Sequence, residues 1–236
     1  MNKVLCFELG GDYAHFKKYY TTKSPLSFEF PPPPTVIGII SAILGFDKKG
    51  NFYLSKYPKG SYRISIKINN PVNKVRWTLN FIDTKHHFWK IKNRTQIRTE
   101  FLKNPSYTIY FWHNDKEIYQ SLKCHLQNHT SFYSISLGLS ELLGNYQYLG
   151  EKSVKEKKGI DFIQIASVVP SSCISKDGIK FSEGKEIFQA NYPVYMNRER
   201  VVEKREKVFF DRKAHSIECK PVRYWQVENE ENIVFF

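Results

Sequence analysis

Lys85, His86 and His87 form the local group whose residue types best suit proton transfer in this sequence. Histidine can act as a base or an acid, and a lysine stabilises charge on a phosphate, so the set could cut RNA beside a 2′-hydroxyl. The alternative is that the three side chains only contact phosphates. We favour contact and predict no catalytic residue, because residue types alone do not place a hydroxyl in line with a leaving oxygen.

Cys124, His125 and His129 lie close together, and the two histidines are spaced so that a helix brings them to one face. A structural zinc ion needs four ligands, and no carboxylate or further thiol stands at a suitable spacing. Gly10 and Gly11 are too few for a phosphate-binding loop, and no Walker-type or dinucleotide glycine motif occurs. We therefore expect a solvated helix face, no metal and no cofactor.

Positive charge is concentrated in one part of the chain. The 236 residues carry a net charge of +13, and residues 48–103 hold fourteen basic and two acidic side chains, which gives +12 in that segment. Residues 1–47 are neutral, and residues 104–236 carry +1. A charge of this size and concentration favours an anionic partner.

Nine aromatic residues are interspersed among these cations. Cations neutralise phosphates and aromatic rings stack on unpaired bases, so the combination is typical of a site for single-stranded nucleic acid. A membrane surface would favour an amphipathic helix, whereas this segment alternates like β-strands. The other interpretation is a solvated basic face whose aromatic rings turn into the core. We favour nucleic acid and expect no membrane partner.

Hydrophobic periodicity predicts alternating strands and helices. The first helix begins at Pro34 and Thr35 and ends at Gly45, because proline suits a first helical turn and glycine a helix end. The expected strands are residues 3–9, 62–68, 106–112 and 161–169, and the other expected helices are residues 116–127 and a short one near 138–144. This order is that of an α+β, ferredoxin-like (RRM-like) domain.

The basic segment contains an insertion in this domain. Residues 74–103 are predicted to form a basic β-arm between the second and third strands, with its strands at 76–82 and 94–101. We assign residues 1–169 to the ferredoxin-like domain and residues 170–236 to a smaller β-rich C-terminal region. The central strands lack the glycine- and aromatic-rich sequence of RNA-recognition domains, so we expect the loop and the arm to hold the RNA.

Several motifs recur in order along the chain. Asp12-Tyr-Ala-His-Phe-Lys-Lys18 precedes four prolines at 31–34 and the apolar helix, and further motifs lie at residues 95–105, 137–142 and 232–236. Together they resemble the CRISPR-associated protein 5 family of the repeat-associated RNA-binding (RAMP) superfamily. Residues 19–25 are most similar to the subtype I-B branch of that family.

The resemblance implies a non-catalytic subunit of a type I-B CRISPR surveillance (Cascade) complex in antiviral defence. Such a subunit binds the 5′ handle of the guide RNA, caps a row of repeated backbone subunits, contacts the large subunit and meets target DNA only indirectly. Subtype I-C relatives instead cut the precursor guide, so the alternative is a metal-independent endoribonuclease acting through Lys85, His86 and His87. The residues that we expect to bind RNA are Lys17, Lys18, Tyr19, Arg76, Trp77, Lys85, His86, Arg94 and Arg98.

Cys6, Cys124, Cys173 and Cys219 have no short paired spacing, which favours free thiols over disulfides. No signal peptide is visible, and no run approaches the roughly 18 apolar residues that span a bilayer. Reduced thiols and a cytoplasmic location are therefore expected.

Overall fold

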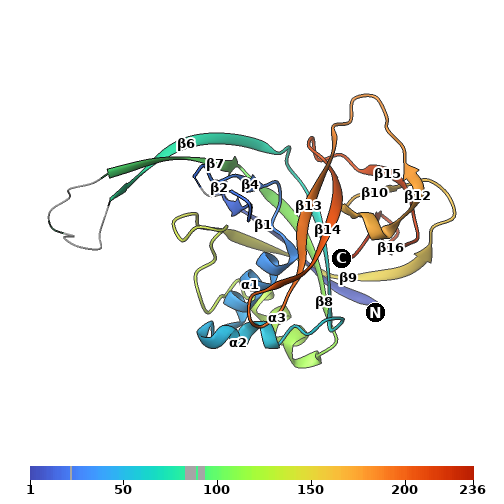
Figure 1. Cartoon of the computed structure of the whole chain (residues 1–236). Helices are drawn as coiled ribbons and strands as arrows, with labels where there is room; N and C mark the ends of the chain where they lie inside the picture. Colours follow the sequence, from blue (N-terminus) through green and yellow to red (C-terminus); the bar gives the residue numbers. More distant parts are fainter. Residues whose placement is uncertain (22, 83–88, 90–93) are drawn as a thin grey trace.

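An antiparallel sheet forms the centre of the molecule in the computed structural model, which describes residues 1–21, 23–82, 89 and 94–236 (Figure 1). Its strand order is β17-β16-β9-β1-β8-β5. The four strands at its heart are β1 (Lys3–Gly10), β5 (Tyr62–Ile68), β8 (Ser106–His113) and β9 (Asn145–Lys158). Each neighbouring pair among these four is antiparallel, and the chain is a mixed α+β protein.

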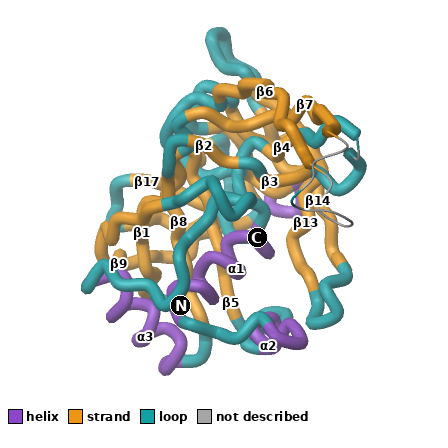
Figure 2. Tube along the Cα trace, turned by 90° about the vertical axis from the view of Figure 1, so that its left-hand side faces the viewer, coloured by secondary structure: helices purple, strands orange, loops and turns teal. Residues whose placement is uncertain are grey.

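Two long helices connect these strands (Figure 2). α1 (Pro33–Leu44) follows β1, and α3 (Lys116–Gln127) joins β8 to β9. Gly45 ends α1 with a left-handed φ of 73°, and the carboxylate of Asp115 accepts hydrogen bonds from the first backbone amides of α3. Both predicted long helices are confirmed. A 3-10 turn, η1 (Lys49–Asn51), and a short helix, α2 (Phe52–Ser55), lead from α1 to β5.

β1 is buried on both faces. Leu5, Phe7 and Leu9 pack with α1 and α3 in the main hydrophobic core. Val4 and Cys6 point to the opposite face and pack with β16 (Arg223–Val227) and β17 (Glu231–Ile233). Because successive side chains alternate between faces, a strand covered on both sides must be apolar throughout, as residues 4–7 are.

The fourth of these central strands was predicted in the wrong place. β9 pairs with β1, whereas residues 161–169 give only β10 (Ile163–Ile165) and the start of β11 (Val169–Pro170), which belong to two other sheets. β9 lacks an apolar run because much of it is exposed to solvent, so its sequence gives no strand signal. The short helix expected near 138–144 is a turn, closed by a bridge between Ser136 and Leu143.

The basic arm is a two-stranded antiparallel ribbon. β6 (Asn73–Ile82) and β7 (Arg94–Lys103) pair from Asn73–Lys103 to Ile82–Arg94 and extend away from the body (Figure 1). The ribbon lies between β5 and β8 in sequence, as predicted. β2 (Tyr13–Ala14) pairs with the base of β7, so the loop after β1 is attached to the arm.

The C-terminal region adds two three-stranded sheets and returns to the central one. β13 (Ile187–Met196) and β14 (Val202–Asp211) form a long hairpin with β11 at its edge. The other sheet contains β10, β12 (Ile174–Ile179) and β15 (Ile217–Pro221), and a 3-10 turn, η2 (Ser171–Cys173), precedes β12. The division of the chain at residue 170 stays a prediction. Among the described residues, no helix is long and apolar enough to cross a membrane.

The reactivity of the four cysteine thiols provides a test of this packing. Cys124 is exposed, whereas burial raises the pKa of Cys6 and of Cys219 to about 12 and that of Cys173 to about 11. Because the thiolate is the reactive form, iodoacetamide at pH 8 should modify Cys124 first and the other three only after unfolding. Peptide mass spectrometry of native and denatured protein measures this order. Rapid native modification of Cys6 would contradict the burial of β1.

Candidate nucleic-acid interface

The arm has two chemically different faces. β6 and β7 pair without a bulge, so side chains alternate strictly and each paired couple shares a face. One face carries the cations Lys74, Arg76, Arg94 and Arg98. The other carries the apolar side chains Val75, Trp77, Leu79, Phe81, Ile97 and Phe101. A strand of RNA that lies flat on the basic face would therefore not reach Trp77.

Arg94 and Arg98 are the most available cations of the basic face. Both are exposed, and no carboxylate of the described residues lies within ion-pair distance of either side chain. They are four residues apart on β7, which is about 13 Å along an extended strand. Two exposed guanidinium groups in this arrangement suit consecutive contacts with an anionic backbone.

Two buried carboxylates neutralise the cations at the base of the arm. Glu29 accepts hydrogen bonds from the Nζ atoms of Lys18 at 3.1 Å and of Lys74 at 2.8 Å. Glu100 contacts Lys74 Nζ at 3.0 Å and Arg76 Nη2 at 3.3 Å. We call Lys18, Glu29, Lys74, Arg76 and Glu100 the basal ion network. It joins the loop after β1 to both strands of the arm.

The carboxylates of this network stay ionised. Burial alone would raise the pKa of Glu29, but Lys74, the Tyr192 hydroxyl and Lys18 outweigh it and hold that pKa below 4.5. Burial opposes ionisation of Glu100 too, and Lys74 with Arg76 brings its pKa below 4.5. The charges of Lys18, Lys74 and Arg76 are thus partly or fully compensated within the protein.

The loop residues predicted to bind RNA have different surroundings. Lys17 is exposed on β3 (Phe16–Lys17), which pairs with β4 (Ser27–Phe28). Lys18 is buried, with only 9% of its surface exposed. The Tyr19 ring is 52% exposed, and the guanidinium carbon of Arg205 lies 4.6 Å from its centroid. Of the three loop residues, Lys17 and Tyr19 are accessible to a ligand.

Trp77 is partly occupied by protein contacts. Its ring centroid lies 4.4 Å from that of Tyr13 and 5.3 Å from that of Phe101, and 42% of the residue is exposed. The aromatic residues of the basic segment as a whole divide between two environments. Tyr57 and Phe101 are in the core, whereas Phe52 and Phe81 are exposed. Some of these rings therefore turn into the core, and stacking of the exposed ones on bases stays a prediction.

Two groups were considered for chemistry from their residue types. Lys85, His86 and the neighbouring His87 lie outside the described residues. His125 Nδ1 is 3.1 Å from the hydroxyl of Thr130, and the His129 ring packs against Tyr146. Where the structure describes the chain, no three His, Cys, Asp or Glu side chains are grouped so that they could hold a metal ion.

Sequence reasoning missed the contribution of the C-terminal hairpin. Arg205 and Lys207 are exposed on β14, and Arg205 reaches the loop through Tyr19. The net charge of residues 104–236 is only +1, because acidic residues elsewhere in this segment offset these cations. The charge distribution therefore did not indicate a basic site here. The pairing of β13 with β14, and the contacts of the hairpin with residues 19–30, bring Arg205 to the loop. Tyr192 of β13 stacks on Phe30 at 4.1 Å and donates to Glu29 Oε2 at 2.7 Å.

A comparison with models of protein families shows which family this chain resembles. Residues 4–113, from β1 to the end of β8 and including the arm, match the family model described as CRISPR-associated protein (Cas_Cas5). Over these residues the chain is similar to the CRISPR-associated protein 5 family. A search of curated proteins by sequence gives no match.

Solved structures extend the fold beyond the matched half. The chain is similar to the crystal structure of a CRISPR protein from Archaeoglobus fulgidus, with a TM-score of 0.58, 15% identity and coverage of 99% of this chain and 98% of that chain. A chain of a structure described as a CRISPR RNA-guided surveillance complex gives a TM-score of 0.50 at 8% identity, covering 91% of each chain. Because both alignments cover nearly the whole chain, the fold that is shared with these two structures includes the C-terminal sheets. The subtype I-B assignment stays a prediction.

Proposed function

We propose that this chain is the subunit that binds the 5′ handle of the guide RNA in a type I-B CRISPR surveillance complex, within a cytoplasmic antiviral defence. The match of residues 4–113 to the CRISPR-associated protein (Cas_Cas5) family model supports a role in such a complex. One similar solved chain comes from an RNA-guided surveillance complex. A ferredoxin-like interpretation of the body agrees with the strand order β9-β1-β8-β5 and with the two crossover helices.

The observation that carries the proposal is the outer part of the basic face, where Arg94 and Arg98 are exposed and no carboxylate of the described residues pairs with them. Arg94 and Arg98 protrude from the body on a ribbon whose base is held rigidly by the basal ion network. A projecting ribbon can lie along a strand of RNA and contact its phosphates without reading bases. Lys17 extends the cationic surface onto the adjoining loop. In the proposed complex, the backbone subunit and the large subunit meet this chain around the same guide.

Salt dependence tests the assignment of the arm. Binding of single-stranded nucleic acid loses about 0.7 logarithmic units of affinity per tenfold increase in salt for each neutralised phosphate. The double variant Arg94→Gln, Arg98→Gln should therefore flatten the slope of log affinity against log salt by about 1.4. Fluorescence anisotropy with a labelled handle RNA, between low and moderate salt, measures the slope.

Two further variants make this test specific. Lys155→Gln with Lys157→Gln removes two exposed cations on β9, far from the arm in sequence, and should leave the slope unchanged. Arg76→Gln should change the slope less than either arginine of the pair, because Glu100 already compensates Arg76. If the double variant on β9 flattened the slope as much as the double variant on the arm, a binding site on the arm would be refuted.

A further inference from the structure

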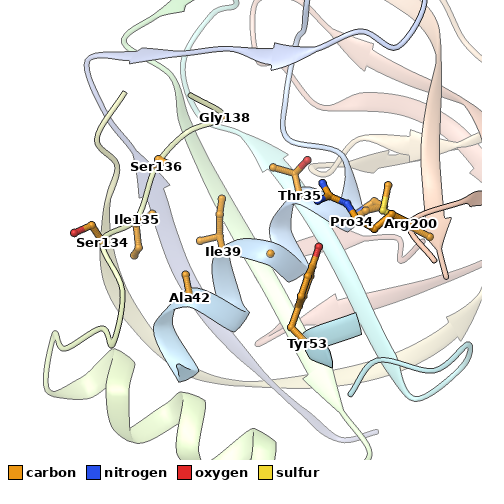
Figure 3. A pocket seen from close by; sticks show the side chains of 12 residues that line it. Pro34, Thr35, Ile39, Ala42, Tyr53, Ser134, Ile135, Ser136, Gly138 and Arg200 are labelled. Atoms are coloured by element: carbon orange, nitrogen blue, oxygen red, sulfur yellow. The ribbon is translucent and has the colours of Figure 1, made fainter. Parts of the chain in front are cut away.

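A groove runs over helix α1, between the loop after α3 and the tip of the β13–β14 hairpin (Figure 3). Its larger part has a volume of about 480 Å³, and it continues into a part of about 280 Å³, since both are lined by Gly38, Ala42, Tyr53 and Arg200. Figure 3 shows α1 as the floor, Tyr53 on one side, residues 134–136 on the other, and Thr35 with Arg200 at one end. Every residue that lines this groove is described by the structure.

The groove is built from three separate parts of the chain. Gly38 lies on the exposed side of α1, and a Cβ added there would meet nothing within 4 Å. The loop after α3 is fixed to α1 by hydrogen bonds from the amides of Phe132 and Tyr133 to the carbonyl oxygens of Ile43 and Ala42. The absent side chain at Gly38 leaves the helix backbone open to a flat ligand between Tyr53 and the loop.

The tip of the β13–β14 hairpin supplies the charge of the groove. Asn197 fixes the turn, since its Oδ1 accepts from the amide of Val201 and its carbonyl accepts from the amide of Arg200. Arg200 takes a left-handed φ of 63°, an unfavourable conformation for arginine. No carboxylate of the described residues pairs with its guanidinium group. Its side chain lies at the end of the groove, beside Thr35 (Figure 3).

The chemistry of these walls fits one ligand class. Tyr53 and the 48% exposed Tyr133 offer ring faces, and the hydroxyls of Thr35, Ser134 and Ser136 make no hydrogen bond within the part of the chain that the structure describes. Arg200 and Lys48 offer cations, with Asp47 as the one acid in the lining. A nucleotide has a planar ring for the tyrosines, polar edges for the hydroxyls and a phosphate for the arginine.

We propose that this groove binds a single unpaired nucleotide of RNA, with its base beside Tyr53 and its phosphate at Arg200. The proposal rests on the RNA-binding function above and adds a site that none of the arm residues lines. The same chemistry would accept a free nucleoside monophosphate, so the experiment includes both kinds of ligand. Stacking and one charge-assisted phosphate contact give the groove its affinity.

Variants at the floor and at the tip test the groove. Gly38→Phe should fill it, Gly38→Ala should leave it open, and Arg200→Gln should remove the phosphate contact. We expect Gly38→Phe to weaken binding of a short oligoribonucleotide about 5- to 100-fold, the loss that follows when one base is no longer stacked. Arg198 is an exposed neighbour that does not line the groove, so Arg198→Gln should change the affinity for the same oligoribonucleotide less than about twofold. Unchanged melting temperatures establish that the variants fold.

Crosslinking gives a second readout. RNA carrying 5-iodouridine should crosslink to Tyr53 or Tyr133 in the wild type and lose that crosslink in Gly38→Phe, and excess uridine monophosphate should compete only if free nucleotides bind too. Equal affinity and equal crosslinking for wild type and Gly38→Phe would overturn the proposal that the groove binds a nucleotide. If the arm variant Arg94→Gln, Arg98→Gln still loses affinity in that case, the proposed function survives without the groove. If neither the groove variants nor the arm variant lost affinity for RNA, both the groove and the proposed function would be refuted.

Discussion

Alanine in place of Gly138 is expected to lower the free energy of unfolding by about 4 kcal/mol, near the upper end for one substitution. Gly138 has a φ of 108°, where a residue with a Cβ is strained. A Cβ at this position would lie 1.9 Å from the carbonyl oxygen of His15. The contact cannot relax easily, because the amide of His15 donates to the carbonyl of Leu137 at 2.9 Å and holds the two segments together.

Gly150 provides a matched control. Its φ of 111° is nearly that of Gly138, but a Cβ there would meet nothing within 4 Å. Gly150→Ala therefore measures the backbone strain alone, about 1 to 2 kcal/mol, and the difference between the two variants measures the steric contact. Thermal unfolding should show Gly138→Ala melting about 4 to 10 °C below Gly150→Ala. Equal losses would mean that the turn at 138 moves away from His15 without cost.

The sequence predicted the elements whose signals are local. The helix from Pro33 to Leu44 has proline at one end and glycine at the other, and the arm has two alternating strands of equal length. β9 was missed because its pairing with β1 and β16 satisfies its backbone while its side chains face solvent. A strand stabilised by its neighbours in the sheet carries no hydrophobic pattern of its own.

The candidate site could be predicted by residue type but not by arrangement. Arg94 and Arg98 were chosen as cations, and the strand pairing places them on one exposed face. The same pairing puts Trp77 on the other face, which follows from a period of two once the register is known. Glu29 and Lys74 are 45 residues apart, so nothing in the sequence indicated that Lys74 would be compensated.

The basal ion network leads to the last expected result, a loss of about 3 kcal/mol in the Glu29→Gln variant. Glu29 is only 9% exposed and accepts from Lys18, Lys74 and Tyr192. Removing its charge leaves two ammonium groups without their shared partner, and breaking a buried ion pair costs about 3 to 5 kcal/mol. The melting temperature should fall by about 6 to 12 °C. Glu156→Gln, which breaks an exposed pair with Arg223, should cost less than about 1 kcal/mol.

The effect of Glu29→Gln should depend on pH in a defined direction. The pKa of Glu29 lies below its ordinary value of 4.5, so its stabilising contribution is present above pH 4.5 and is lost as the pH falls through the lowered pKa. The melting temperatures of wild type and variant should therefore differ most at neutral pH and converge as the pH falls below 4.5. Since the network fixes the base of β6 and β7 to the loop, hydrogen exchange should also rise in both strands of the arm in the variant at pH 7. A constant difference between pH 7 and pH 3 would show that Glu29 does not hold the arm as a charged group.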